Sequence, residues 1–457
     1  MTNLELDIKA LKKKSMYTPV RILAIGFAIV IFTGAVLLSL PIAAQSGGIT
    51  PFIDCIFTST SAVCVTGLVT VDTGTHWTYF GKTVIMLLIE IGGLGFMSVA
   101  TLGFFFLGKR ITLKERLIMQ EAMNVNTLQG LVKMVKYVLI FTFSVEAVGA
   151  VLFSTQFIPE FGIGKGIYYS VFHAVSAFCN AGFDLMGNFK SVTEYANNSV
   201  VILTISALIA IGGLGFYVWV EIYNGRGIKR LSLHSKIVIY STIFLIVGGA
   251  VLMFIFEMNN PGTMKGMSFK GKVLSSIFAS VSPRTAGFNS IQLDKMTTAG
   301  NFLTIILMFI GGSPGSTAGG IKTATAVVLF MTVVSVVRGR EDTEIFQKRI
   351  SKETVYKSLV ITVLGFVIVI GVTMILSITQ QPDIPFEYFL YEATSAFATV
   401  GLTLGITTKL TFVGKLIIAI TMYAGRVGPL TIILALAKNK KSKSGKIKYP
   451  EGKILIG

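Results

Sequence analysis

Ser61-Ala-Val-Cys-Val-Thr-Gly67-Leu68 is a short strip that follows an apolar segment of half the usual spanning length, and the chain contains this arrangement four times. The other copies are Ser176-Ala-Phe-Cys-Asn-Ala-Gly182-Phe183, Ser282-Pro-Arg-Thr-Ala-Gly287-Phe288 and Ser395-Ala-Phe-Ala-Thr-Val-Gly401-Leu402. The four glycines are 115, 105 and 114 residues apart, so nearly the whole chain is one unit repeated. Four similar strips of main chain brought to one axis are what a cation-selective pore requires.

The composition is typical of a protein that crosses a membrane several times. Of the 457 residues, 53% are hydrophobic and only 14% are charged. The net charge of +18 would suggest a nucleic-acid partner in a soluble protein, but 28 of the 40 lysines and arginines fall into five segments. These segments are 1–21, 109–136, 226–236, 338–357 and 438–453. Because positive charge collects on cytoplasmic loops, we expect both termini to be cytoplasmic. The expected protein is a multi-pass protein of the cell membrane that contacts lipids and binds no nucleic acid.

Eight apolar segments are long enough to span the bilayer, two in each copy of the unit. They cover about residues 22–43, 81–107, 134–157, 199–223, 236–256, 300–337, 357–378 and 411–437. Between the members of each pair lies a shorter segment, which we interpret as a re-entrant pore helix. The four shorter segments are Pro51–Val65, Gly166–Cys179, Gly271–Val281 and Pro385–Phe397.

Each unit therefore consists of a span, a pore helix, a strip and a second span, and the even number of crossings gives all four copies one orientation. The expected fold is an all-α membrane protein with eight transmembrane helices and four re-entrant helices, in four parallel repeats around a pseudo-fourfold pore. Inverted repeats, which many secondary transporters use, do not give this pattern. The expected divisions are a basic N-terminus at 1–21, repeat 1 at 22–108, a linker and repeat 2 at 109–225, a linker and repeat 3 at 226–340, a linker and repeat 4 at 341–437, and a basic tail at 438–457.

The strips supply main-chain oxygens, which hold a dehydrated cation without a fixed charge that would trap it. Glycine lets each strip adopt backbone angles closed to other residues and lets the strips approach one another. The alternative is that the glycines only permit tight helix crossings, but four of them, each after a short re-entrant segment, favour the pore. Asp72 and Asp184 follow two of the strips, and they either attract cations to the outer entrance or are solvated loop residues.

The second spans share a glycine pattern. Its copies are Ile91-Gly-Gly-Leu-Gly-Phe96, Ile211-Gly-Gly-Leu-Gly-Phe216, Ile310-Gly-Gly-Ser-Pro-Gly315 and Ala424-Gly-Arg-Val-Gly-Pro429. Arg426 stands where the other copies have glycine. A guanidinium inside a span costs at least about 2.5–3.5 kcal/mol on insertion scales, so it requires a partner or water. We expect a pore-adjacent charge that competes with the ion, with Glu90 or another pore-side oxygen as its partner.

The third copy cannot be a continuous helix, because Ile310–Thr323 contains five glycines and a proline. Such backbone at mid-membrane must line a cavity, and a break beneath the strips is well placed to form a gate. The gate residues are Gly311, Gly312, Ser313, Pro314, Gly315, Ser316, Thr317, Ala318, Gly319, Gly320 and Lys322. Lys322 places its ammonium either close to the ion route or toward the cytoplasmic interface. A phosphate-binding loop is excluded, because Ile321 breaks the required glycine–lysine spacing and no strand precedes it.

In these motifs the chain resembles the Trk/Ktr/HKT superfamily of potassium transporters, and most of all the KtrB-type membrane subunit, from about residue 20 onward. In that family each strip glycine is a filter residue, glycine in all four copies goes with preference for potassium over sodium, an arginine occupies the position of Arg426, and a flexible intramembrane loop interrupts the third repeat. The resemblance implies potassium-binding carbonyls at Val65, Thr66, Gly67, Asn180, Ala181, Gly182, Thr285, Ala286, Gly287, Thr399, Val400 and Gly401. Pro283-Arg284 departs from the apolar residues of the other strips, which makes the four sides unequal and leaves the strictness of selectivity open.

The resemblance also implies a homodimer, with the C-terminus at its interface, and a cytoplasmic ring of RCK-type, KtrA-like nucleotide-binding subunits. The expected function is potassium uptake through a channel-like pore, with K+ as the transported ion, Na+ as a candidate activator and no covalently bound cofactor. The alternative is a sodium-conducting or poorly selective monovalent cation transporter of the same fold. We expect no enzyme, because the sequence contains no nucleophile elbow, HExxH motif or carboxylate pair. Glu146, inside a span, is either functional or bonds a neighbouring helix.

Overall fold

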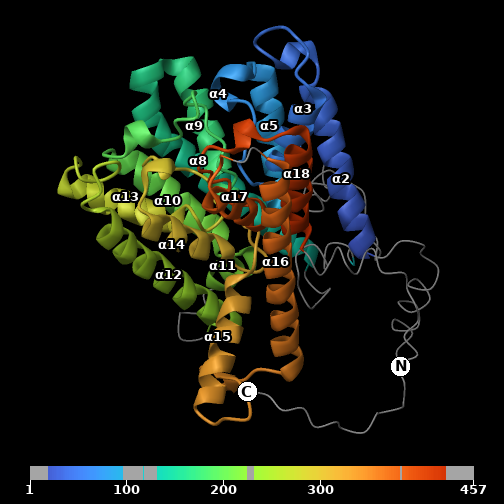
Figure 1. Cartoon of the computed structure of the whole chain (residues 1–457), viewed down its shortest axis with the longest axis vertical. Coiled ribbons are helices and arrows are strands. Elements are labelled where there is room, and N and C mark those ends of the chain that lie inside the picture. Colours follow the sequence, from blue (N-terminus) through green and yellow to red (C-terminus); the bar gives the residue numbers. More distant parts are fainter. Residues whose placement is uncertain (1–18, 96–116, 118–130, 224–230, 381–382, 429–457) are drawn as a thin grey trace.

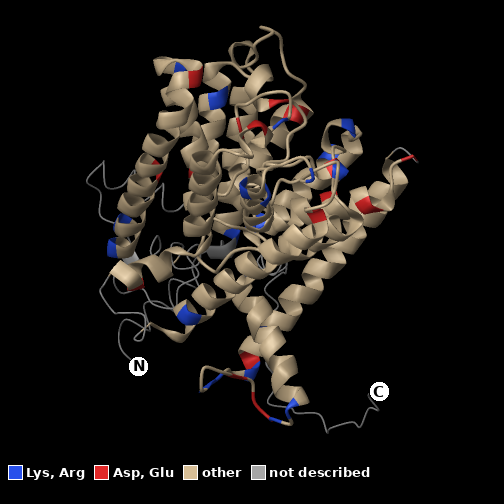
Figure 2. Ribbon diagram, turned by 90° about the vertical axis from the view of Figure 1, so that its left-hand side faces the viewer, with Lys and Arg blue, Asp and Glu red and all other residues tan. Residues whose placement is uncertain are grey.

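Long apolar helices form the outside of the molecule (Figure 1). The computed structural model describes residues 19–95, 117, 131–223, 231–380 and 383–428. Among them, four helices are long and apolar enough to cross a membrane: α2 (Pro19–Leu38), α8 (Leu131–Phe161), α12 (Leu233–Glu257) and α16 (Lys352–Thr379). They are the first spans of the four predicted repeats. Phe32, Phe244 and Phe366 are each more than half exposed on these helices, and Figure 2 shows the long helices largely free of charge between their ends, as helices in lipid should be.

Four shorter helices lie at the predicted re-entrant positions. They are α3 (Phe52–Cys64), α9 (Ile163–Phe178), α13 (Phe269–Val281) and α17 (Phe386–Ala398). Each contains 13 to 16 residues, too few to cross the bilayer. The C-terminal half of each is buried. The structure therefore confirms the predicted alternation of long outer helices and short inner ones.

In each second span, the first described helix ends near the glycine pattern. The second spans begin as α5 (Tyr79–Leu94), α10 (Ser199–Gly213), α14 (Thr298–Phe309) and α18 (Phe412–Val427). Gly95, Gly215 and Gly428 have φ of +78°, +92° and +94°, a left-handed conformation that ends a helix. After Gly215 the chain continues as α11 (Phe216–Tyr223), turned by 91° from α10. The sequence analysis identified a break in the third second span alone, and the structure shows a further break in the second repeat.

In three of the four second-span patterns the first glycine allows the main chain of a pore helix to approach. A Cβ atom on Gly92, Gly212 or Gly425 would overlap the carbonyl oxygen of Val63, Phe178 or Phe397, which lie at the C-terminal ends of α3, α9 and α17. Close helix crossing, considered above for the strip glycines, is thus the role of these glycines.

The four repeats close into a ring. The second span of each repeat contacts the pore helix of the next, in the pairs α5–α9, α10–α13 and α14–α17. The same contact joins α18 to α3, so the last repeat meets the first (Figure 1). Successive application of one contact around four units is what pseudo-fourfold symmetry requires.

A polar bond ties the two spans of each repeat at one end. The capping residue before each second span is bonded to the end of the first span or the residues just after it. The pairs are Thr78 with the carbonyl oxygens of Ile42 and Ala43, Asn198 with Gln156, Thr297 with Glu257, and Thr411 with Gln380. The bond fixes the loop that carries the pore helix and strip between the two spans.

In the third repeat, residues 310–322 separate α14 from α15 (Thr323–Val337). Helices α15 and α16 project beyond the others and are joined by a hairpin of β1 (Glu344–Ile345) and β2 (Lys348–Arg349), in which Glu344 pairs with Arg349 (Figure 1). The short elements α4 (Thr73–His76), η1 (Pro41–Ala43), η2 (Thr193–Tyr195), η4 (Leu293–Lys295) and η5 (Thr407–Lys409) lie in connecting loops. Most of the predicted N-terminus, the linker at 109–130 except residue 117, and the basic tail lie outside the described residues, and the repeat boundaries stay predictions.

The joint between the last and the first repeat contains a buried ion pair. Lys415 Nζ on α18 lies 2.6 Å from Asp54 Oδ1 in the first turn of α3, and the two side chains are 17% and 10% exposed. The Tyr423 hydroxyl adds a hydrogen bond of 2.7 Å to the carbonyl oxygen of Ala24. No linker joins these two repeats, so side-chain bonds hold this joint.

We expect Lys415→Met to lower the stability of the protein by about 3 kcal/mol, because it leaves a buried carboxylate unpaired. Thermal unfolding of the detergent-solubilised protein measures the loss. Adding Asp54→Asn should recover part of it, since the uncompensated charge is then removed. Lys190→Met is the matched control, because the pair of Lys190 and Glu194 is at least half exposed and should contribute less than about 1 kcal/mol. Equal effects of the two lysine changes would contradict the prediction.

Candidate functional site

Each of the four strips contains a non-glycine residue in a left-handed conformation two positions before its glycine. Val65, Asn180, Thr285 and Thr399 have φ of +57°, +59°, +76° and +51°, although none is glycine. The strip glycines two residues later also have positive φ, from +70° at Gly182 to +94° at Gly401. Such angles are costly for β-branched residues and persist only where surrounding structure holds them. The four strips therefore share one backbone shape despite different side chains.

Four buried serines hold this shape, one at the start of each strip. The Ser61 hydroxyl accepts a hydrogen bond from the Gly67 amide, and Ser395 does the same for Gly401, both at 3.0 Å. The hydroxyls of Ser176 and Ser282 donate instead to the carbonyl oxygens of Phe183 and Phe288. Sequence reasoning missed these serines, although the signal was present as a serine five or six residues before each strip glycine.

The four strips converge on one another. A Cβ atom built on Gly67 would lie 2.5 Å from the carbonyl oxygen of Ala181, and one on Gly182 would lie 2.6 Å from that of Ala286. The same relation links Gly287 to Val400, at 2.5 Å, and Gly401 to Thr66. The carbonyl oxygen before each strip glycine thus faces the glycine of a neighbouring strip, and the contacts form a closed circle. Only glycine fits at these positions.

Polar atoms in the strips remain without partners. The hydroxyls of Thr66 and Thr399 are buried and have no hydrogen-bond partner in the described structure. The Asn180 amide group lies 3.3 Å from the Thr285 hydroxyl and so links the second strip to the third. Unpartnered buried oxygens are costly unless water or an ion completes their coordination. The donor set of carbonyl and hydroxyl oxygens suits a monovalent cation as the transported substrate.

The segment 310–322 bonds to neighbouring repeats close to the strips. The Ser313 amide donates to the carbonyl oxygen of Gly213, at 3.0 Å, and the Phe216 amide donates to that of Gly315, at 2.8 Å. The Thr317 hydroxyl reaches the carbonyl oxygen of Phe178, at the end of the second pore helix, at 3.3 Å. On the other side, Gly319 packs against the side chain of Thr399 in the fourth strip. The segment therefore contacts repeats two and four and lies directly against the strip ring.

Two positive side chains meet this segment. The Arg426 guanidinium donates to the carbonyl oxygens of Thr317, in the segment, and of Gly92 and Gly93, in repeat one. Its partners are therefore main-chain oxygens rather than Glu90. Lys322 donates from Nζ to the carbonyl oxygen of Ala318, at 2.6 Å, so its ammonium stays within the segment and does not extend toward the cytoplasmic interface.

The two aspartates after the strips differ in their surroundings. Asp72 accepts hydrogen bonds from the Thr75 amide and hydroxyl and from the Phe189 amide, at 2.7 to 2.8 Å, and thereby joins the loops after strips one and two. Burial raises the pKa of Asp184 to about 7; the hydrogen bond from Met186 opposes the shift and the negative charge of Asp72 adds to it. At neutral pH Asp184 therefore carries only part of a charge.

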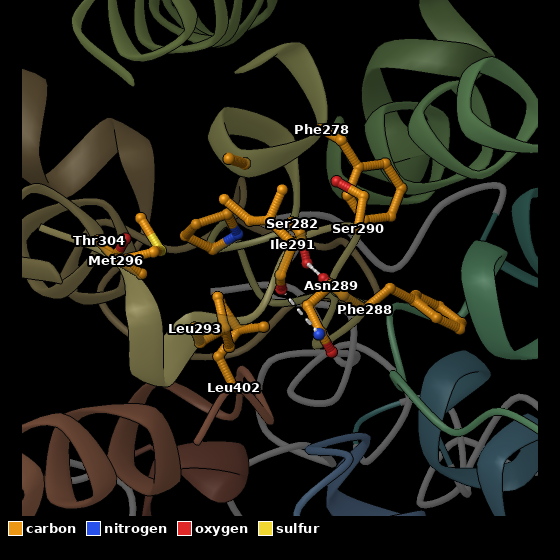
Figure 3. Close-up of a pocket in the computed structure, with 12 residues that line it drawn as sticks. Phe278, Ser282, Phe288, Asn289, Ser290, Ile291, Leu293, Met296, Thr304 and Leu402 are labelled. Atoms are coloured by element: carbon orange, nitrogen blue, oxygen red, sulfur yellow. Dashed lines mark hydrogen bonds between the residues drawn. The ribbon is translucent and has the colours of Figure 1, made fainter. Parts of the chain in front are cut away.

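The third strip contains the arginine that departs from the pattern. Arg284 is 6% exposed, and its Nη2 lies 3.4 Å from the Thr242 hydroxyl on α12, so its guanidinium extends toward the first span of its own repeat. Beside this strip is a small pocket in which Ser282 and Phe288 share a hydrogen bond (Figure 3). Leu293 also lines this pocket. None of residues 285–287 lines the pocket, so it is a gap behind the strip rather than part of the ring.

Comparison with known proteins identifies the family and the fold of the chain. A family model described as TrkH, cation transport protein, matches residues 9–447. The chain is 44% identical to the potassium/sodium uptake protein NtpJ of Enterococcus hirae and 42% identical to the Ktr system potassium uptake protein B of Bacillus subtilis, each over 96% of this chain and 97% of the relative. The crystal structure of the potassium transporter TrkH from Vibrio parahaemolyticus shares the fold, with a TM-score of 0.72, 17% identity, and coverage of 93% of this chain and 86% of that one.

These matches confirm the resemblance, the fold class and the expectation of a membrane transporter rather than an enzyme. They extend over all four strips and the interrupted second spans, so they cover the whole candidate site. The chain belongs to the TrkH family of cation transport proteins.

Proposed function

We propose that this protein takes up potassium through a pore lined by the main chain of the four strips. The observation that carries the proposal is the closed circle in which each strip glycine faces the carbonyl oxygen of a neighbouring strip. Carbonyl oxygens replace the hydration shell of K+ and release it again, because they carry no full charge. The membrane potential supplies the driving force, about 2.3 kcal/mol per elementary charge for each 100 mV.

The pore helices support the same role. Helices α3, α9, α13 and α17 all end at a strip, and the C-terminal end of a helix carries about half a negative elementary charge. Four such ends around one axis stabilise a cation beside the strips. Arg426 and Lys322 oppose them, which limits how long an ion stays.

Sodium conduction is the second candidate, because one relative is named a potassium/sodium uptake protein. Glycine at all four strip positions supports potassium preference in the family that the chain resembles. Arg284 makes the third strip differ less from the other three than its sequence suggests. Its guanidinium bonds Thr242 on α12 and so extends toward the first span of its own repeat. We retain Na+ as a candidate activator, with no site assigned to it.

The segment 310–322 is the proposed gate. It is non-helical, contacts repeats two and four through hydrogen bonds with Gly213, Phe178 and Arg426, and lies against the strip ring. Because these bonds are few and mostly to main chain, the segment can leave without unfolding a helix. Arg426, which bonds both the segment and repeat one, is proposed to hold it in place.

The assembly around the pore is also a proposal. A relative named as part of a Ktr system is consistent with a separate partner, which we expect to be a cytoplasmic nucleotide-binding ring below a homodimer. We propose that this partner contacts the projecting ends of α15 and α16, with the charged hairpin between them (Figure 2). The proposal rests on the cytoplasmic orientation that the basic segments predict.

We expect Gly67→Ser and Gly287→Ser to lower the preference for K+ over Na+ about tenfold, equivalent to about 1.4 kcal/mol. Each side chain would displace a carbonyl oxygen that lies 2.5 Å from the new Cβ. Uptake of rubidium and sodium by cells lacking their own systems measures the ratio. Gly371→Ser, in open space on α16, is the control and should leave it unchanged. An unchanged ratio in both strip variants would refute the filter assignment.

A milder variant keeps the glycines. Ser61→Ala and Ser395→Ala remove the acceptors of the Gly67 and Gly401 amides, at a cost of about 1–3 kcal/mol for each buried amide left unpaired. The strips should lose their fixed shape, so ion preference should fall together with thermal stability. Ser170→Ala is the control: its hydroxyl is bonded to Gly166 within α9, so stability alone should fall. Loss of preference in the control would argue against a specific role of the strip serines.

Deleting residues 315–319 should raise potassium flux about tenfold, as expected if a barrier of about 1.4 kcal/mol is removed. Arg426→Gln should act in the same direction, because it releases the bond to Thr317. Flux is measured in proteoliposomes at a fixed potassium gradient. Arg349→Gln, at an exposed hairpin position, serves as the charge control. Reduced or unaltered flux after the deletion would exclude the segment as a gate.

A further inference from the structure

Away from the strip axis, three helices bring two carboxylates and a thiol together. Glu90 lies on α5, Glu146 on α8, and Cys179 caps α9. One potential ligand atom from each lies within 4.8 Å of the other two. Cys179 Sγ is 3.5 Å from Glu90 Oε2 and 3.9 Å from Glu146 Oε1. The sequence-based expectation of no carboxylate pair is therefore wrong. The structure contains such a pair because α5 and α8 bring Glu90 and Glu146 together, although the two residues are far apart in the chain.

The cluster brings two carboxyl groups and a thiol together in a buried place. Glu146 is 6% exposed and Cys179 is fully buried. Among the described residues, neither carboxylate forms an ion pair. Arg426 is close by, but its guanidinium is bonded to main-chain oxygens, including that of Gly93 at 3.4 Å. Two carboxyl groups in contact in an apolar interior are stable only when a proton or a metal cation lies between them.

Two further oxygens at this place have no partner. Glu90 Oε1 is buried and has no N–H or O–H donor, and the side chains within hydrogen-bonding reach of its carboxyl group are those of Glu146 and Cys179. The hydroxyl of Thr142, whose side chain is fully buried, has no partner either. Thr142 precedes Glu146 by one turn on the same face of α8. Because side chains on a helix lean toward its N-terminus, the carboxylate of Glu146 extends over the turn of Thr142. The unpartnered Thr142 hydroxyl therefore lies on the helix face that carries Glu146, one turn away from it.

We propose that Glu90, Glu146 and Cys179, completed by the Thr142 hydroxyl, bind a divalent metal ion of the zinc or cadmium class. Carboxylate oxygen and thiolate sulfur are ligands of such ions, usually in four-coordinate sites, whereas Mg2+ prefers oxygen alone. Binding replaces the thiol proton and any proton between the carboxylates, and these protons leave to solvent without a change of oxidation state. The ion ties α5, α8 and α9 together next to the second strip.

The test uses Cd2+ as the probe and the full-length chain in detergent. Cys55→Ser with Cys64→Ser leaves Cys179 as the last of the three cysteines, so the ultraviolet sulfur-to-cadmium band reports this site alone. We expect the band at one Cd2+ per chain by equilibrium dialysis. Glu90→Gln and Glu146→Gln, added to this background, should weaken Cd2+ binding at least about tenfold. Glu194→Gln, at an exposed position, should not change it, and Mg2+ should not compete.

A second measurement does not depend on the folding of the glutamine variants. Cd2+ should raise the thermal unfolding temperature of the Cys55→Ser, Cys64→Ser chain and not that of Cys179→Ser. The latter retains Cys64, which occupies the equivalent end of α3 and belongs to no such cluster among the described residues. Absence of the band in a monodisperse chain, or glutamine variants that bind Cd2+ as tightly as the Cys55→Ser, Cys64→Ser parent chain, would overturn the proposal. These outcomes require no ion flux, so they are independent of the proposed function.

Discussion

Four segments of main chain meet at one axis so closely that no Cβ atom fits between them, and the rest of the structure follows from this constraint. Gly67 faces the carbonyl oxygen of Ala181, and the same contact repeats around the ring. Main chain that packs against main chain cannot be positioned by its own side chains. It is positioned instead by short helices, by buried serines behind each strip, and by second spans whose own glycines admit the pore-helix ends. Glycine is therefore concentrated in two layers, one in the strips and one beside them.

The sequence was sufficient for the outline of this arrangement, because the outline depends on period and length. Four strips at nearly equal spacing, each after a segment too short to cross, predicted the four repeats and the short helices. The break after Gly213 was missed because Ile211-Gly-Gly-Leu-Gly-Phe216 is as apolar as a continuous span. Its cause is tertiary: the Phe216 amide bonds the carbonyl oxygen of Gly315 in another repeat. The available signal was the glycine four residues after the start of the pattern in three of the copies, namely Gly95, Gly215 and Gly428.

Other features of the site depend on contacts between distant parts of the chain, and sequence reasoning could not identify them. Glu90 was a reasonable partner for Arg426 because it is one turn from Gly93 on the same span. The structure instead directs the guanidinium to main-chain oxygens and places Glu90 beside Glu146 and Cys179. Periodicity assigns residues to helices, but the rotation of neighbouring helices decides which polar groups meet. The serines behind the strips are an intermediate case, because their repeated position was visible while their function was not.

The bonding of the strips and of segment 310–322 differs in a way that fits the proposed division between a filter and a gate. The strips are surrounded by buried pore helices and joined to every neighbour, so moving one would disturb the ring. The segment is attached through a small number of hydrogen bonds, from Ser313, Thr317 and Arg426 among others, each contributing about 0.5–1.5 kcal/mol. A partner that binds one arrangement only a few kcal/mol more tightly than the other is enough to shift such an equilibrium. The rigid strips that are proposed to select the ion can therefore contact the more weakly attached segment that is proposed to gate its passage.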